Sequence, residues 1–198
     1  MADNATTRLM NESLAVIEAE HAALAAILSG LRYFVRNAAR GVPPDPVVLE
    51  KMLDYVEFFP ERLHHPHEDE HLFRRVRART HDTDDMLDRL EAEHESGARR
   101  LADLREALAD WKSQGAPALP ALAALLEAYT AGYLSHMNAE ERWIFPAARS
   151  HLTAEDWQAI HAAFCAAPDP LTGSDAQAAF TRLFHEIARL APPPIGIG

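Results

Sequence analysis

The sequence predicts an all-α protein built on an up-down-up-down antiparallel four-helix bundle, with additional helices at its C-terminal end. Three observations support this fold. Apolar residues recur in steps of three and four through four long segments, which is the period of an amphipathic helix. Short stretches, two with Gly and Pro and one rich in Thr and Asp, separate these segments, so consecutive helices should run antiparallel beside each other. Hydrophobic residues make up 48% of the chain, and many are the helix formers Ala and Leu.

Composition excludes several classes of protein. A chain of 198 residues suits one well-buried domain with an extension. A formal charge of −11 without a long basic run weighs against non-specific binding to nucleic acid or to an anionic membrane. The single cysteine, Cys165, excludes an intrachain disulfide and a metal centre held by this chain's cysteines alone. We find no signal peptide and no apolar run that approaches a membrane span, so we expect a cytoplasmic protein.

The first two helices are predicted from their stop signals. The first covers about residues 9–39, because Gly41 and a proline-rich loop follow it. The second covers about residues 46–79, although Pro60 and Pro66 lie inside it. Each of these prolines removes a backbone donor and tends to kink a helix, so the register of this segment can change along its length.

Two further helices complete the predicted bundle. The third covers about residues 84–113 and follows a turn rich in Thr and Asp. The fourth covers about residues 117–149, with Pro120 tolerated in its first turn. The face of this helix that carries His136 should also carry Trp143, which lies two turns further on.

The pattern changes after residue 150. A short capped helix should begin near Thr153, and a last helix is predicted over about residues 175–190. We therefore divide the chain into a metal-binding four-helix bundle over 1–150, a C-terminal helical extension over 151–190 that packs on the bundle, and a flexible tail over 191–198.

One short pattern occurs twice in the chain. The stretch HHPHEDEHLF begins at His64, and the stretch HMNAEERWIFP begins at His136. Each copy places a histidine four residues before a glutamate, Glu68 or Glu140, and this spacing puts both side chains on one helix face. Two such pairs on facing helices would provide most of a two-metal site.

Two more histidines, His21 and His94, lie inside apolar stripes on the first and third predicted helices. A single histidine in such a stripe is more often a satisfied core residue than a ligand. Their occurrence together with two His-x-x-x-Glu pairs favours the ligand interpretation. The candidate metal ligands are His21, His64, Glu68, His94, His136 and Glu140.

The ligand on the second helix has an alternative. On a straight helix, the apolar face that ends at Leu63 would continue to His67 and would pair His67 with His71. The alignment of the two copies favours His64 with Glu68 instead. We adopt the alignment, because prolines in this helix can reset its register, and we keep His67 as the alternative.

Several neighbouring residues carry weaker expectations. We expect His65 either to be exposed or to lie just outside the ligand set. Asp69 and Glu141 follow the two glutamates by one residue, or about 100° around a helix, so they should point toward solvent or a neighbouring helix. Gly97 and Gly132 lie near the candidate histidines and leave room either for a small ligand or for close helix packing.

An inward histidine on each of four helices, with a glutamate on two of them, resembles the bacterial hemerythrin family, the HHE cation-binding domain, over about residues 10–150. The resemblance implies two non-haem iron ions, bridged by an oxo, hydroxo or water ligand, with zinc or manganese as substitutes. It also implies that Glu68 and Glu140 bridge both metals. The oxygen carriers of the family have two histidines one turn apart on the third helix, whereas here Ala98 follows His94 by four residues.

The resemblance implies that the protein binds or senses a small ligand such as O₂ or nitric oxide, or handles iron or peroxide in a stress response. Two other classes stay open at this point. One is a di-iron enzyme, either a peroxidase or a nitric oxide reductase, or an iron-cluster repair factor. The other is a signalling module that binds a partner protein. The oligomeric state is also open, with a homodimer as one option.

Overall fold

The computed structural model describes residues 4–166, and its regular elements are all helical, with no strand among those residues. The predicted all-α class is confirmed. The helix predicted over 175–190 and the tail over 191–198 lie outside the described residues. The elements are α1 (Asn4–Ala38), α2 (Pro46–Val56), η1 (Glu57–His64), α3 (His65–His67), η2 (Glu68–Phe73), α4 (Arg74–Arg79), α5 (Asp84–Gln114), η3 (Ala116–Ala118), α6 (Leu119–Ala139), η4 (Glu140–Ile144), α7 (Phe145–His151), α8 (Ala154–His161) and η5 (Ala162–Ala166).

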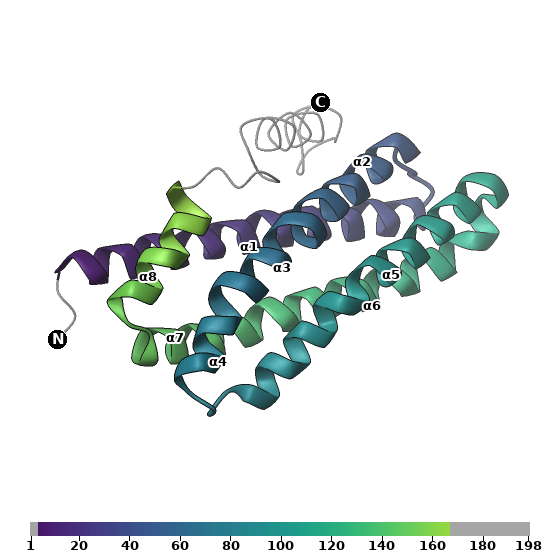
Figure 1. The fold of residues 1–198 in the computed structure, drawn as a ribbon. Helices are drawn as coiled ribbons and strands as arrows, with labels where there is room; N and C mark the ends of the chain where they lie inside the picture. Colours follow the sequence, from purple (N-terminus) through teal and green to yellow (C-terminus); the bar gives the residue numbers. More distant parts are fainter. Residues whose placement is uncertain (1–3, 167–198) are drawn as a thin grey trace.

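The helical elements form columns that lie side by side along the long axis of the molecule (Figure 1). The first column is α1, the second runs through residues 46–79, the third is α5, and the fourth runs through residues 119–151. Helix α1 packs against α2 and α6, and α5 also packs against α2 and α6. Helix α8 begins after Thr153 as expected, where a reciprocal capping box forms with Asp156, and it packs on α1 and η2.

The apolar core is divided into two clusters. One cluster includes Leu24, Phe34, Met52 and Leu101, and the other includes Leu14, Leu72, Leu87 and Ile144. On each column the buried candidate ligands lie where one cluster ends and the other begins. A polar layer therefore crosses the bundle, with apolar side chains on both sides that exclude water from it.

Two segments of the second column have π-helical hydrogen bonding, η1 and η2. Pro60 lies inside η1, and a proline cannot donate the usual i→i−4 hydrogen bond. The i→i+5 bonds of a π segment add a residue to the turn and shift the register of everything that follows. After Phe59 the buried face therefore continues at His64, while Leu63 is only partly buried.

The fourth column contains a third π segment, η4, and it corrects one expectation. Trp143 was predicted on the buried face, but it is 50% exposed and the guanidinium of Arg142 lies over its ring at 5.3 Å. Ile144 is fully buried in its place. The prediction was wrong because it assumed regular α-helical periodicity through residues that form a wider turn.

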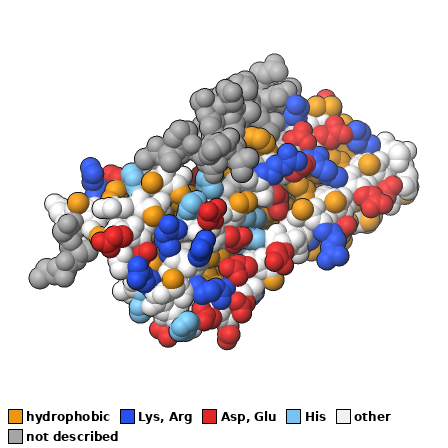
Figure 2. Space-filling view, in the orientation of Figure 1, with side chains coloured by type: hydrophobic (Ala, Val, Ile, Leu, Met, Phe, Trp, Pro, Cys, Tyr) orange, Lys and Arg blue, Asp and Glu red, His pale blue; other side chains and the backbone are white. Residues whose placement is uncertain are grey.

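Helix α1 is long and apolar enough to cross a membrane by length and composition alone, which differs from our expectation that no apolar run approaches that length. Of the apolar window, 44% is buried inside the structure. A core helix of a bundle meets the same criterion, and α1 packs against α2, α6 and α8. On the face shown in Figure 2, acidic and basic side chains are interspersed over the described helices.

The π segment η4 predicts which of two alanine substitutions, at Trp143 or at Ile144, destabilises the protein more. A regular α-helix would predict the opposite order. Ile144→Ala should lower the free energy of unfolding by about 2–5 kcal/mol, because it leaves a cavity in the core. Trp143→Ala should cost about 1 kcal/mol or less, because this side chain is half exposed. Denaturant unfolding of both variants checks the order. If Trp143→Ala proves the more destabilising change, the helix keeps its α register and the assignment of η4 is wrong.

Candidate metal centre

The structure brings all six candidate ligands together in the polar layer of the bundle. Every column contributes one histidine, and the second and fourth columns contribute a glutamate as well. All six side chains are buried, and Glu68 and Glu140 are 0% exposed. The residues and their elements are His21 on α1, His64 on η1, Glu68 on η2, His94 on α5, His136 on α6 and Glu140 on η4.

The oxygens of Glu68 face two different pairs of histidines. Its Oε1 lies 3.4 Å from His64 Nε2 and 3.6 Å from His21 Nε2. Its Oε2 lies 3.7 Å from His94 Nε2. The two oxygens of one carboxylate therefore serve opposite halves of the site.

Glu140 is divided in the same way from the opposite side. Its Oε2 lies 3.2 Å from His21 Nε2, while its Oε1 lies 3.1 Å from His136 Nε2 and 4.0 Å from His94 Nε2. One half of the site is thus formed by His21 and His64, and the other half by His94 and His136. Both carboxylates reach both halves, which is the arrangement that two bridged cations require.

Most of the central polar atoms lack hydrogen-bond partners among residues 4–166, whereas His94 Nε2 and His136 Nε2 lie 2.9 Å apart, within hydrogen-bonding distance. Both oxygens of Glu68, both oxygens of Glu140 and His21 Nε2 are buried without a hydrogen bond. A buried carboxylate without a partner costs several kcal/mol or more. Imidazole nitrogens and carboxylate oxygens are ligands for iron, manganese and zinc, so a pair of such cations fits this set of donors.

The outer nitrogens of the four histidines are all paired with carboxylates. Each Nδ1–H can donate to one acidic side chain at 2.8–2.9 Å, which turns Nε2 toward the centre of the site. We call these four acidic residues the carboxylate ring. The pairs are His21 with Glu141, His64 with Glu20, His94 with Asp69, and His136 with Glu93.

The carboxylate ring links the columns in a closed cycle. Each of its members is the chain neighbour of a candidate ligand, and each contacts a histidine on another column. An acidic residue of the first column contacts the histidine of the second column. In the same way the second column contacts the third, the third contacts the fourth, and the fourth contacts the first. Asp69 and Glu141 accordingly point to neighbouring helices, as expected, although their contacts with histidines were not foreseen. The available signal was an acidic residue directly beside four of the six candidate ligands.

The hemerythrin HHE cation-binding domain matches residues 12–148 of the chain. The chain belongs to this family. The match includes most of each of the four columns, with the six candidate ligands and the carboxylate ring. Neither the search of curated proteins nor the search of solved structures found a significant match. Family membership supports metal binding by the His and Glu cluster that the fold assembles.

The charges in this hemerythrin-family site favour bound cations. Burial lowers the pKa of His21, but Glu140 and Glu68 outweigh it and raise this pKa to about 11. Burial also lowers the pKa of His136, but Glu140 raises it more, and the pKa rises to about 9. Burial raises the pKa of Glu140, yet His136 and His21 bring it well below its usual range. The site therefore holds a negative potential that attracts positive charge.

The histidines near the ligand set are placed as follows. His67 is half-buried, with its ring 5.6 Å from that of His71 and 5.5 Å from that of Phe164, and it joins no group of converging ligand atoms among the described residues. His65 is 5% exposed, so of the two expectations for it, exposure is wrong. Its ring stacks on that of His94, with centroids 4.0 Å apart.

The two glycines differ in what they accommodate. A Cβ at Gly97 would overlap the carboxylate of Glu61, so this glycine allows close packing of a side chain. Gly132 lines a small pocket beside Arg100, and a Cβ there would lie 3.3 Å from Arg100 Nη1. The free space of this pocket, about 10 Å³, admits about one water-sized molecule. His94 and His136 form part of its wall.

The carboxylate ring predicts that Glu141 affects metal affinity although it faces partly outward. Glu141→Ala should weaken iron binding roughly 10–100-fold, because His21 loses the acceptor that orients it. Titration against a competing chelator measures the change. Glu106→Ala, an exposed change on α5, is the matched control and should leave the affinity unaltered. Equal affinities in both variants would show that the ring does not support the ligands.

Proposed function

We propose that this chain is a non-haem di-iron protein whose centre binds a small ligand such as O₂ or nitric oxide, or reacts with peroxide. The observation that carries the proposal is the division of two fully buried carboxylates between two pairs of histidines. His21 and His64 would hold one iron, His94 and His136 the other, and Glu68 and Glu140 would span both. We also infer an up-down-up-down antiparallel order for the four columns, in keeping with their ring of contacts and short connections.

The donor set supports iron in particular. Imidazole and carboxylate ligands suit iron, manganese or zinc, and the set contains no sulfur ligand that would select a softer metal. Membership of the hemerythrin family favours iron among these. When bound, a pair of iron ions supplies open coordination positions and reversible one-electron chemistry.

The size of the pocket supports a small ligand. The pocket that reaches His94 and His136 has a free space of only about 10 Å³, so it excludes an organic substrate and leaves only a very small ligand. Tyr133 and Arg100 also line it, and the guanidinium of Arg100 can donate a hydrogen bond to such a ligand.

Turnover of peroxide or nitric oxide is a second candidate function. Glu61 lies behind the pocket wall and accepts a hydrogen bond from the hydroxyl of Tyr133. Burial raises the pKa of Glu61, although Tyr133 and Arg100 oppose the shift. A carboxyl group with a raised pKa beside the site is suited to hold a proton that a reduction step would consume.

The proposal predicts two iron ions per chain after expression in iron-replete medium, and loss of both from Glu140→Ala. Losing Glu140 removes a ligand from each half of the site at once. Elemental analysis counts the metal, with Glu106→Ala as a control that should keep two. A wild-type protein with no metal, or with one zinc only, would contradict the proposal, as would a Glu140→Ala variant that keeps two irons.

Thermal melts of the wild type and of Glu140→Ala add a second test. With iron bound, Glu140→Ala should melt at a lower temperature than the wild type, because it lacks the stabilisation from bound metal. After treatment with a chelator, the difference should vanish or reverse, since the variant no longer buries that unpaired carboxylate. An equal deficit with and without chelator would mean that Glu140 acts only in packing.

The ligand prediction is tested with the reduced iron form. Mixing it with nitric oxide in the absence of O₂, and separately with O₂ or with peroxide, should change its absorption spectrum, with about one ligand bound per centre. The chelator-treated protein is the control and should show no change. Return to the starting spectrum on removal of the ligand indicates a carrier or sensor, whereas continued consumption of peroxide or nitric oxide indicates an enzyme. A spectrum that none of the three ligands alters would refute the proposed function.

A further inference from the structure

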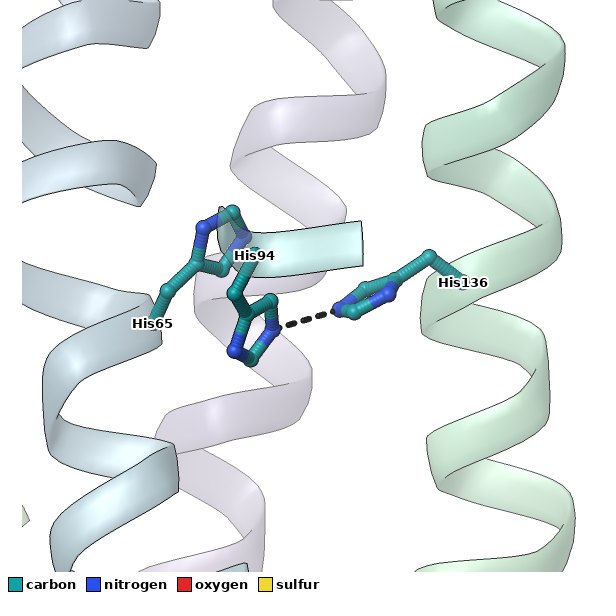
Figure 3. A group of neighbouring side chains, drawn as sticks. All are labelled: His65, His94 and His136. Carbon is teal, nitrogen blue, oxygen red and sulfur yellow. Dashed lines mark hydrogen bonds between the residues drawn. The ribbon is translucent and has the colours of Figure 1, made fainter. Parts of the chain in front are cut away.

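The small pocket beside His94 and His136 contains one cationic side chain. Of the seven residues that line it, Arg100 is the only lysine or arginine. His65 completes the imidazole part of the lining, and Figure 3 shows its ring beside that of His94, with the contact between His94 and His136 dashed. The rings of His65 and His94 are stacked, with 12° between their planes, so His65 serves as part of the wall. The pocket therefore combines imidazole rings with one guanidinium.

The guanidinium of Arg100 lies at this pocket with donors to spare. Its Nη2 donates a hydrogen bond of 2.7 Å to the backbone oxygen of Glu93, seven residues earlier on α5. A Cβ at Gly132 would lie 3.3 Å from Nη1, so the missing side chain on α6 gives the guanidinium its room. Its Nε is buried without a hydrogen-bond partner among residues 4–166. A guanidinium has several N–H donors, and a buried donor without an acceptor is costly, so an acceptor in the pocket would stabilise it.

The carboxylates on this side of the site are engaged by other groups. Glu93 lines the pocket, but its side chain pairs with His136 at 2.9 Å and with Arg89 at 2.8 Å. Glu61 accepts a hydrogen bond from the hydroxyl of Tyr133. The positive charge at the pocket is therefore left to attract an anion from outside the chain.

A guanidinium at this place acts differently on anionic and on neutral ligands. Hydrogen bonds from a charged donor to an anion are shorter and about twice as strong as those between neutral groups. The attraction also increases where bulk water is excluded. A neutral diatomic molecule offers the same donors only partial charges and gains much less. The free space of about 10 Å³ limits the anion to about one or two heavy atoms.

We propose that Arg100 sets the ligand specificity of the centre, by donating hydrogen bonds to a very small anion in this pocket and so favouring anions over neutral diatomic molecules. The inference rests on the proposed di-iron function and narrows its class of ligand. Among the ligands considered above, the anion of peroxide belongs to the favoured class, whereas nitric oxide and O₂ are neutral.

Fluoride and nitric oxide are the probes, because both are small and only fluoride is charged. Fluoride is titrated into the oxidised iron form by calorimetry, and nitric oxide into the reduced iron form by absorption, so that each gives a dissociation constant. Arg100→Met removes the guanidinium and keeps an unbranched side chain. Arg99→Met is the matched control, because it removes the same charge from an exposed neighbouring position on α5. Iron content and a circular dichroism spectrum verify each variant.

Arg100→Met should weaken fluoride binding roughly 10–100-fold, which corresponds to the loss of a hydrogen bond between charged groups. Its affinity for nitric oxide should change by less than about threefold, and Arg99→Met should keep both wild-type affinities. Equal fluoride affinities in Arg100→Met and Arg99→Met would overturn the assignment. An equal loss for fluoride and nitric oxide would also overturn it, because Arg100 would then only support the shape of the pocket.

Two further variants keep the test decisive if Arg100→Met fails to fold or to hold iron. Arg100→Gln keeps a polar side chain without the charge and should also lose fluoride affinity but not nitric oxide affinity. Arg100→Lys keeps the charge and should bind fluoride more tightly than Arg100→Gln. Wild-type fluoride affinity in Arg100→Gln would overturn the proposal.

The wild type separates this inference from the function on which it rests. A wild-type protein that holds two irons and binds nitric oxide but not fluoride would overturn the anion preference and leave the di-iron function standing. A wild-type chain that binds no iron would overturn both.

Discussion

Two carboxylates buried at the centre of the bundle constrain the rest of the structure. Glu68 and Glu140 are fully shielded from solvent, and none of their four oxygens has a hydrogen-bond partner among the described residues. Such groups are strongly destabilising unless positive charge lies against them. The histidines can carry protons, as the raised pKa values of His21 and His136 show, but they can also turn lone pairs inward to cations. A metal centre is the arrangement that satisfies the oxygens and the nitrogens together.

The backbone departs from regular α-helix at the residues that direct candidate ligands into the site. Segment η1 ends at His64, η2 begins at Glu68, and η4 begins at Glu140. Both η1 and η4 end two residues before a proline, at Pro66 and Pro146. Proline lacks the donor that a regular turn would use, so the wider turn loses less there than elsewhere. Single π turns in helices are frequent at functional sites, and here they set which neighbouring side chains are buried.

These wider turns also mark the limit of what the sequence could predict. Regular spacing with Gly and Pro signals located the helices within a few residues, and the doubled His-x-x-x-Glu pattern indicated the residues that the fold gathers. The exchange of Trp143 for Ile144 on the buried face was missed, because periodicity carries no signal for one extra residue in a turn. Exposure of His65 was one of two expectations and is wrong for a related reason, since one inward histidine was assigned to each helix. The carboxylate ring was hidden because acidic residues are common in a chain of net charge −11.

The carboxylate ring bears on how the site holds its metals. Six carboxylates surround it, from Glu68, Glu140 and the four members of the ring, and all but the central two are partly open to solvent. The four ring members are open enough for solvent to screen them, and Glu93 also pairs with Arg89 at 2.8 Å. The charge that bound cations must balance is therefore chiefly that of Glu68 and Glu140, which are 0% exposed. The ring acts on metal binding mainly through the histidines, because each acidic side chain keeps one Nε2 turned toward the centre.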